Sequence, residues 1–172
     1  MKNQIFILLV FLNFCTGNFL IAQESDKIVK DTKTGNDILL GAVTREGLTN
    51  IGTWFTEEYD LYVPDSASIN YLIQNREKLP YVFVVLGTWC GDSKEHVPHF
   101  YKIMDRIDYP ASKVFMVGVD RDKKAGEFCL ADFDITLVPT FIITSKGEEI
   151  GRIIETPVES LEKDLVNIIK QQ

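Results

Sequence analysis

The feature that most constrains the fold is an apolar run followed closely by a cysteine. Tyr81–Leu86 has the sequence Tyr-Val-Phe-Val-Val-Leu, and short runs of aromatic and β-branched residues are typical of buried strands. The motif Trp-Cys-Gly-Asp-Ser follows at residues 89–93. Apolar residues at helical spacing then predict a helix over residues 94–107. The sequence therefore predicts a strand and a helix, with Cys90 at the start of the helix.

The start of a helix favours a reactive cysteine. Backbone N–H groups there have no partner within the helix, and the helix dipole places a partial positive charge beside them. Both effects stabilise a thiolate, which is the nucleophilic form of cysteine. We therefore expect Cys90 to be a nucleophile. The alternative is an inert thiol on a scaffold without redox function.

Length and charge limit the function classes. The chain has 172 residues, which is enough for one domain with a proper core. It carries 18 basic and 25 acidic residues, and its formal net charge is −7. An acidic chain without a basic stripe argues against nucleic acid and anionic membrane surfaces as partners. We therefore expect neither of them as a partner.

The N-terminus has the pattern of a secretory signal peptide at residues 1–22. Lys2 forms a short positive region, residues 5–14 form an apolar stretch, and Ala22 supplies a small residue before the expected cleavage site. We expect cleavage after Ala22, a periplasmic or secreted mature protein, and no membrane attachment after cleavage. One alternative is an uncleaved membrane anchor.

The cysteines offer a second alternative and define the redox chemistry. Cys15 could carry a lipid, but Phe14 is a poor match for the small residue that such sites require. Signal cleavage removes Cys15 and leaves Cys90 and Cys129. Two cysteines form either one structural disulfide or two separate thiols. The apolar neighbours of Cys129 on a predicted helix suggest that it is a small buried core residue.

The remaining pattern predicts a single α/β domain over residues 38–172, with a central mixed β-sheet flanked by helices on both faces. Residues 23–37 are polar and aperiodic, and we expect a flexible N-terminal arm. An aromatic segment at residues 51–62 is predicted to be a packed flap. The predicted elements are, in order, strand 38–43, a helical turn capped by Thr44, helix 66–78 capped by Ser66, strand 81–86, helix 94–107, strand 113–119, helix 123–132, strand 138–143, a turn at 145–148 into strand 149–154, and helix 158–169.

Four motifs resemble the thioredoxin family over about residues 38–172. Trp-Cys-Gly at residues 89–91 resembles the start of the family's Trp-Cys-x-x-Cys motif, and Pro98 matches the proline that kinks the following helix. Val-Pro-Thr at residues 138–140 resembles the loop whose proline is cis and faces the active cysteine. Lys-Gly-Glu at residues 146–148 resembles the final hairpin turn. The resemblance implies a thioredoxin-like fold with an N-terminal extension.

The departures from the family pattern concern the active site itself. Ser93 stands where the family has its second, resolving cysteine, and Val84 stands where the family has a buried acidic residue that manages the proton of that cysteine. The two losses are consistent, because without a buried thiol no base is needed. Asp92 suits the first turn of a helix, but its charge opposes ionisation of Cys90. The sequence leaves the balance of these two effects open.

A single thiol still supports disulfide exchange. Cys90 can attack a disulfide and hold a mixed disulfide, whereas Ser93 can at most donate a hydrogen bond to the sulfur. We predict a single-cysteine thiol–disulfide exchange protein, either an isomerase or a mixed-disulfide reductase. The resemblance implies that Trp89, Val138 and Pro139 frame the substrate site. It also implies no structural disulfide between the two remaining cysteines.

The expected partners are protein or small-molecule thiols and disulfides, with release by an external thiol or a partner oxidoreductase. The exported context and the additional segment at residues 48–65 are similar to secreted thioredoxin-like branches of Gram-negative bacteria. The alternative function is a redox-inactive binding module for extended peptides. Another is a subunit of an exported assembly, for which the aromatic segment at residues 51–62 would be the contact surface.

Two histidines lie three residues apart in the predicted helix after Cys90. His96 and His99 could be considered metal ligands, but the paired cysteine motif of exported copper chaperones is absent. We expect both histidines to lie on a solvated helix face. The sequence therefore predicts neither a metal site nor a cofactor.

Overall fold

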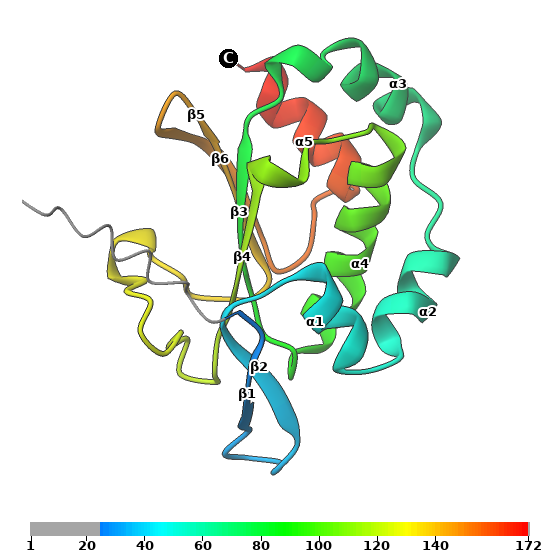
Figure 1. Cartoon of the computed structure of the whole chain (residues 1–172). Helices are drawn as coiled ribbons and strands as arrows, with labels where there is room; N and C mark the ends of the chain where they lie inside the picture. The colour runs from blue at the N-terminus through cyan, green and yellow to red at the C-terminus, as the bar shows by residue number, and fades with distance from the viewer. Residues whose placement is uncertain (1–24, 172) are drawn as a thin grey trace, which may run out of the picture.

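The structure is a computed structural model that describes residues 25–171, so the predicted signal peptide lies outside the described residues. A six-stranded mixed sheet forms its centre, in the spatial order β1-β2-β4-β3-β5-β6 (Figure 1). Strands β3 and β4 are parallel, and the other neighbouring strands are antiparallel. The strands are β1 (Lys27–Lys30), β2 (Asp37–Ala42), β3 (Tyr81–Leu86), β4 (Val114–Gly118), β5 (Thr140–Ser145) and β6 (Glu148–Ile154).

The five α-helices of the described residues lie on one side of this sheet (Figure 1). Their apolar side chains form the main core with sheet residues such as Val84 and Phe141, and Phe100 lies fully buried at its centre. Within residues 25–171, every helix is too short or too polar to cross a membrane. The helices are α1 (Arg45–Asn50), α2 (Trp54–Leu61), α3 (Ser66–Gln74), α4 (Gly91–Arg106) and α5 (Leu161–Lys170), with 3-10 turns η1 (Arg76–Lys78), η2 (Ala111–Lys113) and η3 (Ala131–Phe133).

The elements around the cysteine motif confirm the predicted thioredoxin-like fold. The predicted strand at 81–86 is β3, and α4 begins at Gly91, slightly earlier than predicted. Pro98 lies inside α4 as expected. Lys146 and Gly147 both have positive φ and form the tight turn between β5 and β6, a conformation typical of two-residue hairpin turns. The mixed sheet flanked by helices is therefore confirmed.

Two helices begin at side-chain caps, and one cap differs from the prediction. The Thr44 hydroxyl accepts a hydrogen bond from the Gly47 N–H at 3.0 Å, as the sequence predicts. Asp65, and not Ser66, caps α3, because its carboxylate accepts from the Ser68 N–H at 2.8 Å. Both carboxylates and hydroxyls satisfy the free N–H groups of a first turn, so neighbouring residues of these types compete for the position.

The predicted flexible arm at residues 23–37 is wrong for its described part. Residues of this segment form β1, which pairs with β2 so that Lys27 lies opposite Leu40 and Lys30 lies opposite Asp37. The strand has only four residues, which is too short for a clear alternating pattern. Its order comes from pairing with β2, and a single sequence does not reveal that pairing.

The predicted helix at residues 123–132 is also wrong. Lys123 and Gly126 adopt positive φ, and Ala125 forms a β-bridge with Phe128, so the segment is a loop that ends in η3. Left-handed residues interrupt the hydrogen bonds that a helix needs. The distribution of helices is consequently more one-sided than predicted, because a single 3-10 turn lies on the second face of the sheet.

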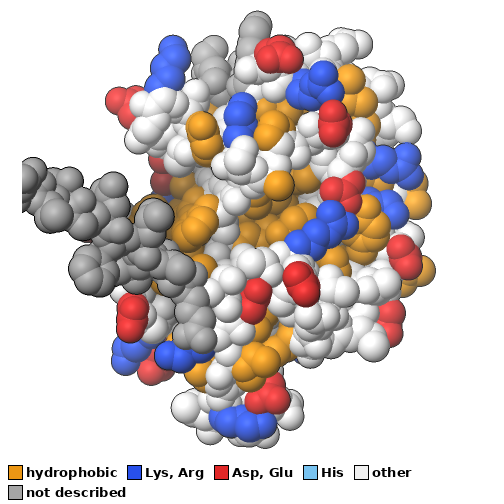
Figure 2. Space-filling view, in the orientation of Figure 1, with side chains coloured by type: hydrophobic (Ala, Val, Ile, Leu, Met, Phe, Trp, Pro, Cys, Tyr) orange, Lys and Arg blue, Asp and Glu red, His pale blue; other side chains and the backbone are white. Residues whose placement is uncertain are grey.

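This second face carries its own small core. Val85, Val117 and Val138 are buried there, together with Ala125. The loop covers the face incompletely, so that Phe115 and Phe133 remain 45% and 36% exposed. Figure 2, which views the sheet from its edge as Figure 1 does, shows hydrophobic side chains in the middle of the view, with charged side chains of both signs around them. The second core matters for the site because the residues of the cysteine motif pack against it.

Close packing between β2 and β4 predicts a sensitive glycine. A Cβ atom at Gly118 would lie 2.5 Å from the carbonyl oxygen of Leu39, whereas a Cβ at Gly91 would meet nothing within 4 Å. We expect Gly118→Ala to lower the free energy of unfolding by about 1–3 kcal/mol, because the backbone must move to relieve the overlap. Urea unfolding measures the change. Gly91→Ala is the matched control, and an equal loss in both variants would contradict the prediction.

Candidate active site

The candidate active site is built on the turn between β3 and α4. The backbone N–H of Cys90 donates to the Gly87 carbonyl at 2.8 Å, and the Cys90 carbonyl accepts from the Lys94 N–H at 3.1 Å. Cys90 is therefore the N-cap residue of α4, at the positive end of the helix dipole. Its side chain is partly exposed and carries a free thiol. The turn thus places the sulfur where an incoming substrate can reach it.

The sulfur of Cys90 faces the loop before β5. Cys90 Sγ lies 3.2 Å from the carbonyl oxygen of Val138, and the Val138–Pro139 peptide bond is cis. The Oδ2 atom of Asp92 lies 3.6 Å from the same sulfur. The structure therefore brings together Cys90, Val138 and Pro139, which the sequence analysis placed in one site, although Cys90 and Val138 are 48 residues apart in sequence.

Ser93 supports the turn, and within residues 25–171 its hydroxyl has no hydrogen bond to the Cys90 sulfur. It is fully buried, and its Oγ accepts a hydrogen bond from the Gly87 N–H at 3.1 Å. Gly87 also accepts the hydrogen bond from Cys90. Ser93 is thus a positioning residue that fixes the loop carrying Cys90, whereas the sequence allowed it at most a hydrogen bond to the sulfur.

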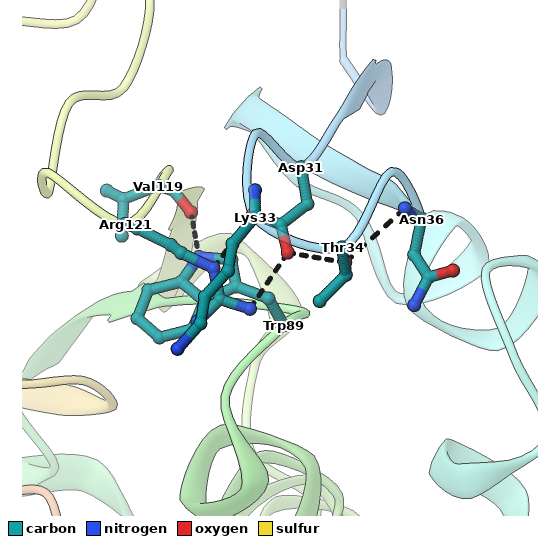
Figure 3. Close-up of polar contacts among 7 residues, drawn as sticks. All are labelled: Asp31, Lys33, Thr34, Asn36, Trp89, Val119 and Arg121. Carbon is teal, nitrogen blue, oxygen red and sulfur yellow. Dashed lines mark hydrogen bonds and ion pairs between the residues drawn. The ribbon is translucent and has the colours of Figure 1, made fainter.

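Trp89 is held by contacts on two sides. Its indole Nε1 donates to the carbonyl of Val119 at 2.8 Å, and the guanidinium carbon of Arg121 lies 4.7 Å from the ring centroid (Figure 3). Stacking of a guanidinium on an indole combines dispersion with a cation–π attraction. Trp89 also packs with Cys90 against the second core. These contacts fix the indole beside the cysteine.

The N-terminal hairpin reaches this site through an ion pair that the sequence analysis missed. Asp31 is almost fully buried, and its two oxygens accept from Nε and Nη2 of Arg121, each at 2.8 Å (Figure 3). The Thr34 hydroxyl donates to the same carboxylate at 2.6 Å. The hydrogen bonds from Arg121, and then that from Thr34, hold the pKa of Asp31 well below its usual range. The ion pair joins residues 90 positions apart, and no local sequence pattern predicts a contact of this kind.

The remaining candidate residues differ from expectation in their burial. His96 and His99 are 7% and 9% exposed, so the prediction of a solvated helix face is wrong. Tyr62 and Glu58 of the aromatic segment lie against His99, because α2 packs along α4. Cys129 is exposed in the loop between β4 and β5, so the prediction of a buried core residue is wrong as well. The reason is that the helix expected to bury Cys129 does not form.

The aromatic segment at residues 51–62 is a packed element, as predicted. Phe55 is buried, and its ring lies 5.5 Å from that of Tyr101 on α4. Arg45 lies over the rings of Tyr59 and Tyr101, and it forms a bidentate ion pair with Asp105. The segment therefore packs mainly against α4 through its aromatic side chains.

Comparison with known proteins agrees with this geometry. The family model described as Thioredoxin matches residues 64–171. The chain belongs to the thioredoxin family. The match begins before α3 and includes the cysteine turn, the cis-proline loop and the final hairpin, whereas β1, β2, α1 and α2 precede it.

The relatives of this thioredoxin family member include mitochondrial thioredoxins. Thioredoxin O, mitochondrial, of Oryza sativa subsp. japonica is 32% identical over 95 residues, which are 55% of this chain and 52% of that protein. Thioredoxin-3, mitochondrial, of Saccharomyces cerevisiae is 31% identical over 97 residues, 56% of this chain and 70% of that protein. The chain therefore spans about half the length of the rice relative.

A solved structure of a relative is also among the similar proteins. The crystal structure of mitochondrial thioredoxin 3 from Saccharomyces cerevisiae, in its oxidised form, is 24% identical to this chain. The match has a TM-score of 0.37 and covers 67% of this chain and 99% of that one.

The position of Asp92 predicts that its carboxylate slows the reaction of Cys90 with disulfides. A carboxylate 3.6 Å from the sulfur repels negative charge on that sulfur, so its removal should speed the attack of Cys90 on a disulfide. We expect Asp92→Asn to react about three- to tenfold faster with an aromatic disulfide reagent at neutral pH, in a Cys129→Ala background. Glu127→Gln, which removes an exposed acidic side chain of the loop between β4 and β5, is the control. An unchanged or slower reaction of Asp92→Asn would count against this electrostatic account.

The ion pair between Asp31 and Arg121 predicts a pH-dependent stability. Because the pKa of Asp31 is lower in the folded state than in the unfolded chain, the pair stabilises the fold above about pH 4 and loses this effect as pH falls below it. We expect Asp31→Asn to be less stable than the wild type near neutral pH, with a gap that shrinks on acidification. Thermal unfolding between about pH 7 and about pH 3 measures the gap.

The control for this experiment is Asp37→Asn. Asp37 pairs with Lys30 on the surface, where ion pairs contribute little to stability. Its variant should therefore follow the wild type at every pH. A gap between Asp31→Asn and the wild type that stays constant down to the acid limit would contradict the predicted role of the charge.

Proposed function

We propose that this protein is an exported single-cysteine thiol–disulfide exchange protein with Cys90 as its nucleophile. The observation that carries the proposal is the placement of a free, partly exposed thiol at the N-terminus of α4, 3.2 Å from the carbonyl that precedes a cis proline. Family membership supports the same chemistry in general terms.

The exchange step needs only one protein thiol. The Cys90 thiolate attacks one sulfur of a substrate disulfide, the substrate S–S bond breaks, and a mixed disulfide forms on Cys90. The departing substrate thiolate takes up a proton from water, and no net oxidation or reduction occurs. Ser93 has no thiol to break the mixed disulfide, so a second thiol must do so. That thiol belongs to the substrate in isomerisation, and to a small thiol or a partner oxidoreductase in reduction.

The surroundings of Cys90 suit an extended protein segment as substrate. The Val138 side chain is buried, so the loop before β5 offers its backbone beside the sulfur, and backbone groups bind extended chains by strand-like pairing. The fixed indole of Trp89 offers an apolar and aromatic surface on the same turn. Protein disulfides and mixed disulfides with small thiols are therefore the proposed substrates.

The proposal of export rests on the N-terminal sequence. The positive residue, the apolar stretch and the small residue before Gln23 form the pattern of a cleaved signal. Cleavage would release the domain into the periplasm or the medium. In an oxidising compartment, substrates with disulfides are common.

A redox-inactive binding module is the second candidate, and one observation favours it. Two oxygen atoms lie close to Cys90 Sγ, one from the Val138 carbonyl and one from the Asp92 carboxylate. Oxygen atoms of this kind can accept a hydrogen bond from a thiol but repel a thiolate. If the sulfur stays protonated, the surface formed by the Cys90 turn and the loop before β5 can still bind an extended peptide.

The test of the exchange proposal is the removal of glutathione from a glutathionylated peptide. We expect residues 23–172 with Cys129→Ala to accelerate the release when reduced glutathione is present, and mass spectrometry should detect a transient glutathione adduct on Cys90. The Cys90→Ala variant is the control and should show neither effect. Equal rates with and without Cys90 would reject the exchange function and leave the binding module.

A further prediction concerns the missing second cysteine. Ser93→Cys places a thiol on the first turn of α4, in the position that resolves mixed disulfides in the family. We expect this variant, in the Cys129→Ala background, to reduce a protein disulfide at least about tenfold faster with a dithiol as reductant. Ser66→Cys adds a thiol on the exposed start of α3 and is the control. A gain of the same size in both variants would contradict the assigned position.

A further inference from the structure

The two histidines of the chain form a cluster with a carboxylate that the exchange chemistry does not use. His96 and His99 lie three positions apart on α4, and each is largely buried. One ligand atom of each, together with one carboxylate oxygen of Glu95, lies within 4.8 Å of the others. The chain contains only two histidines, so both of them meet at this one place.

Neighbouring side chains hold His99 in a fixed orientation. The ring of Tyr62 stacks on it with a centroid distance of 3.9 Å, and the Tyr62 hydroxyl donates to the buried Glu162 at 2.7 Å. The Oε2 atom of Glu58 lies 3.3 Å from His99 Nε2. A carboxylate that accepts from one ring nitrogen fixes the tautomer and leaves the lone pair on the other nitrogen. This is the arrangement found behind many metal-binding histidines.

The chemistry of the cluster also suits a cation. Glu95 is exposed, and its carboxylate supplies negative charge beside the two imidazoles. The set of two imidazoles and one carboxylate is typical of zinc with one open position.

The cluster lines a surface pocket. Glu95, His96 and His99 form one wall, and residues of the segment between β6 and α5 form the other. Ser160 Oγ in that segment is buried and has no hydrogen-bond partner among the described residues, so a metal-bound water could donate to it. The first residue of this segment, Glu155, donates its N–H to the carbonyl of Pro139 at 2.7 Å. The pocket is therefore connected to the cis-proline loop.

We propose that Glu95, His96 and His99 bind a zinc ion in this pocket, with water in the fourth position and Glu58 as the hydrogen-bond partner of His99. Ligand atoms on a tetrahedral zinc are separated by about 3.4 Å, given bonds of about 2.1 Å. The inference goes beyond the exchange function and does not depend on it, because no ligand is a residue of the candidate active site.

The test uses residues 23–172 with Cys90→Ala and Cys129→Ala, because thiolates also bind zinc. After treatment with a chelator and its removal, the protein is titrated with Zn²⁺ by calorimetry. We expect one ion per chain. The ring signals of the two histidines in the NMR spectrum should shift together and saturate at the same ratio.

Variants assign the ligands. His96→Gln and His99→Gln should each weaken zinc binding about 100-fold or more, and Glu58→Gln should weaken it about tenfold. Glu95→Gln removes an exposed ligand with little risk to folding, so it keeps the test valid if a histidine variant unfolds. Glu127→Gln is the matched acidic control and should bind like the parent.

Three results would overturn the site. The first is the absence of saturable zinc binding to the parent protein at micromolar concentration. The second is binding that moves neither histidine signal. The third is unchanged affinity in Glu95→Gln and in a folded histidine variant, which would indicate adventitious binding at other surface carboxylates.

Discussion

The contact between the Cys90 sulfur and the Val138 carbonyl is the interaction on which the active site depends. It joins the start of α4 to the loop before β5, which are distant in sequence. The sheet makes this possible, because β3 and β5 are antiparallel neighbours and Val85 lies opposite Thr140. The end of one strand and the start of the other therefore meet at the same edge. Ser93 then fixes the turn that carries the cysteine.

The interior of the domain agrees with the loss of the second thiol. Val84 is fully buried within the main core, at the position where the resemblance to the family implies an acidic residue. A buried carboxylate without a thiol to deprotonate would cost free energy, whereas valine packs without such a cost. The pair of Asp31 with Arg121 joins a residue outside the family match to one inside it, and it attaches the N-terminal hairpin to Trp89.

Sequence reasoning succeeded where the signal is local and failed where it depends on partners. β3, α4 with Pro98, the tight turn at Lys146 and the thioredoxin-like fold all follow from runs and motifs of a few residues. The strand β1 and the pair of Asp31 with Arg121 depend on segments that meet only after folding. The predictions of exposed histidines and of a buried Cys129 were wrong for a related reason. The burial of His99 depends on where α2 packs. The exposure of Cys129 follows because positive φ values prevent the predicted helix.

The most direct test of the central claim is the rate of Cys90 alkylation at about pH 7 in residues 23–172 with Cys129→Ala, measured on the folded protein and on the same protein unfolded in urea. The N-terminus of α4 presents a partial positive charge to the partly exposed sulfur, so the account predicts faster alkylation of the folded protein. That result would establish Cys90 as a working nucleophile at neutral pH. Alkylation of the folded protein that is no faster than that of the unfolded chain, or no labelling of the native protein, would contradict the exchange function.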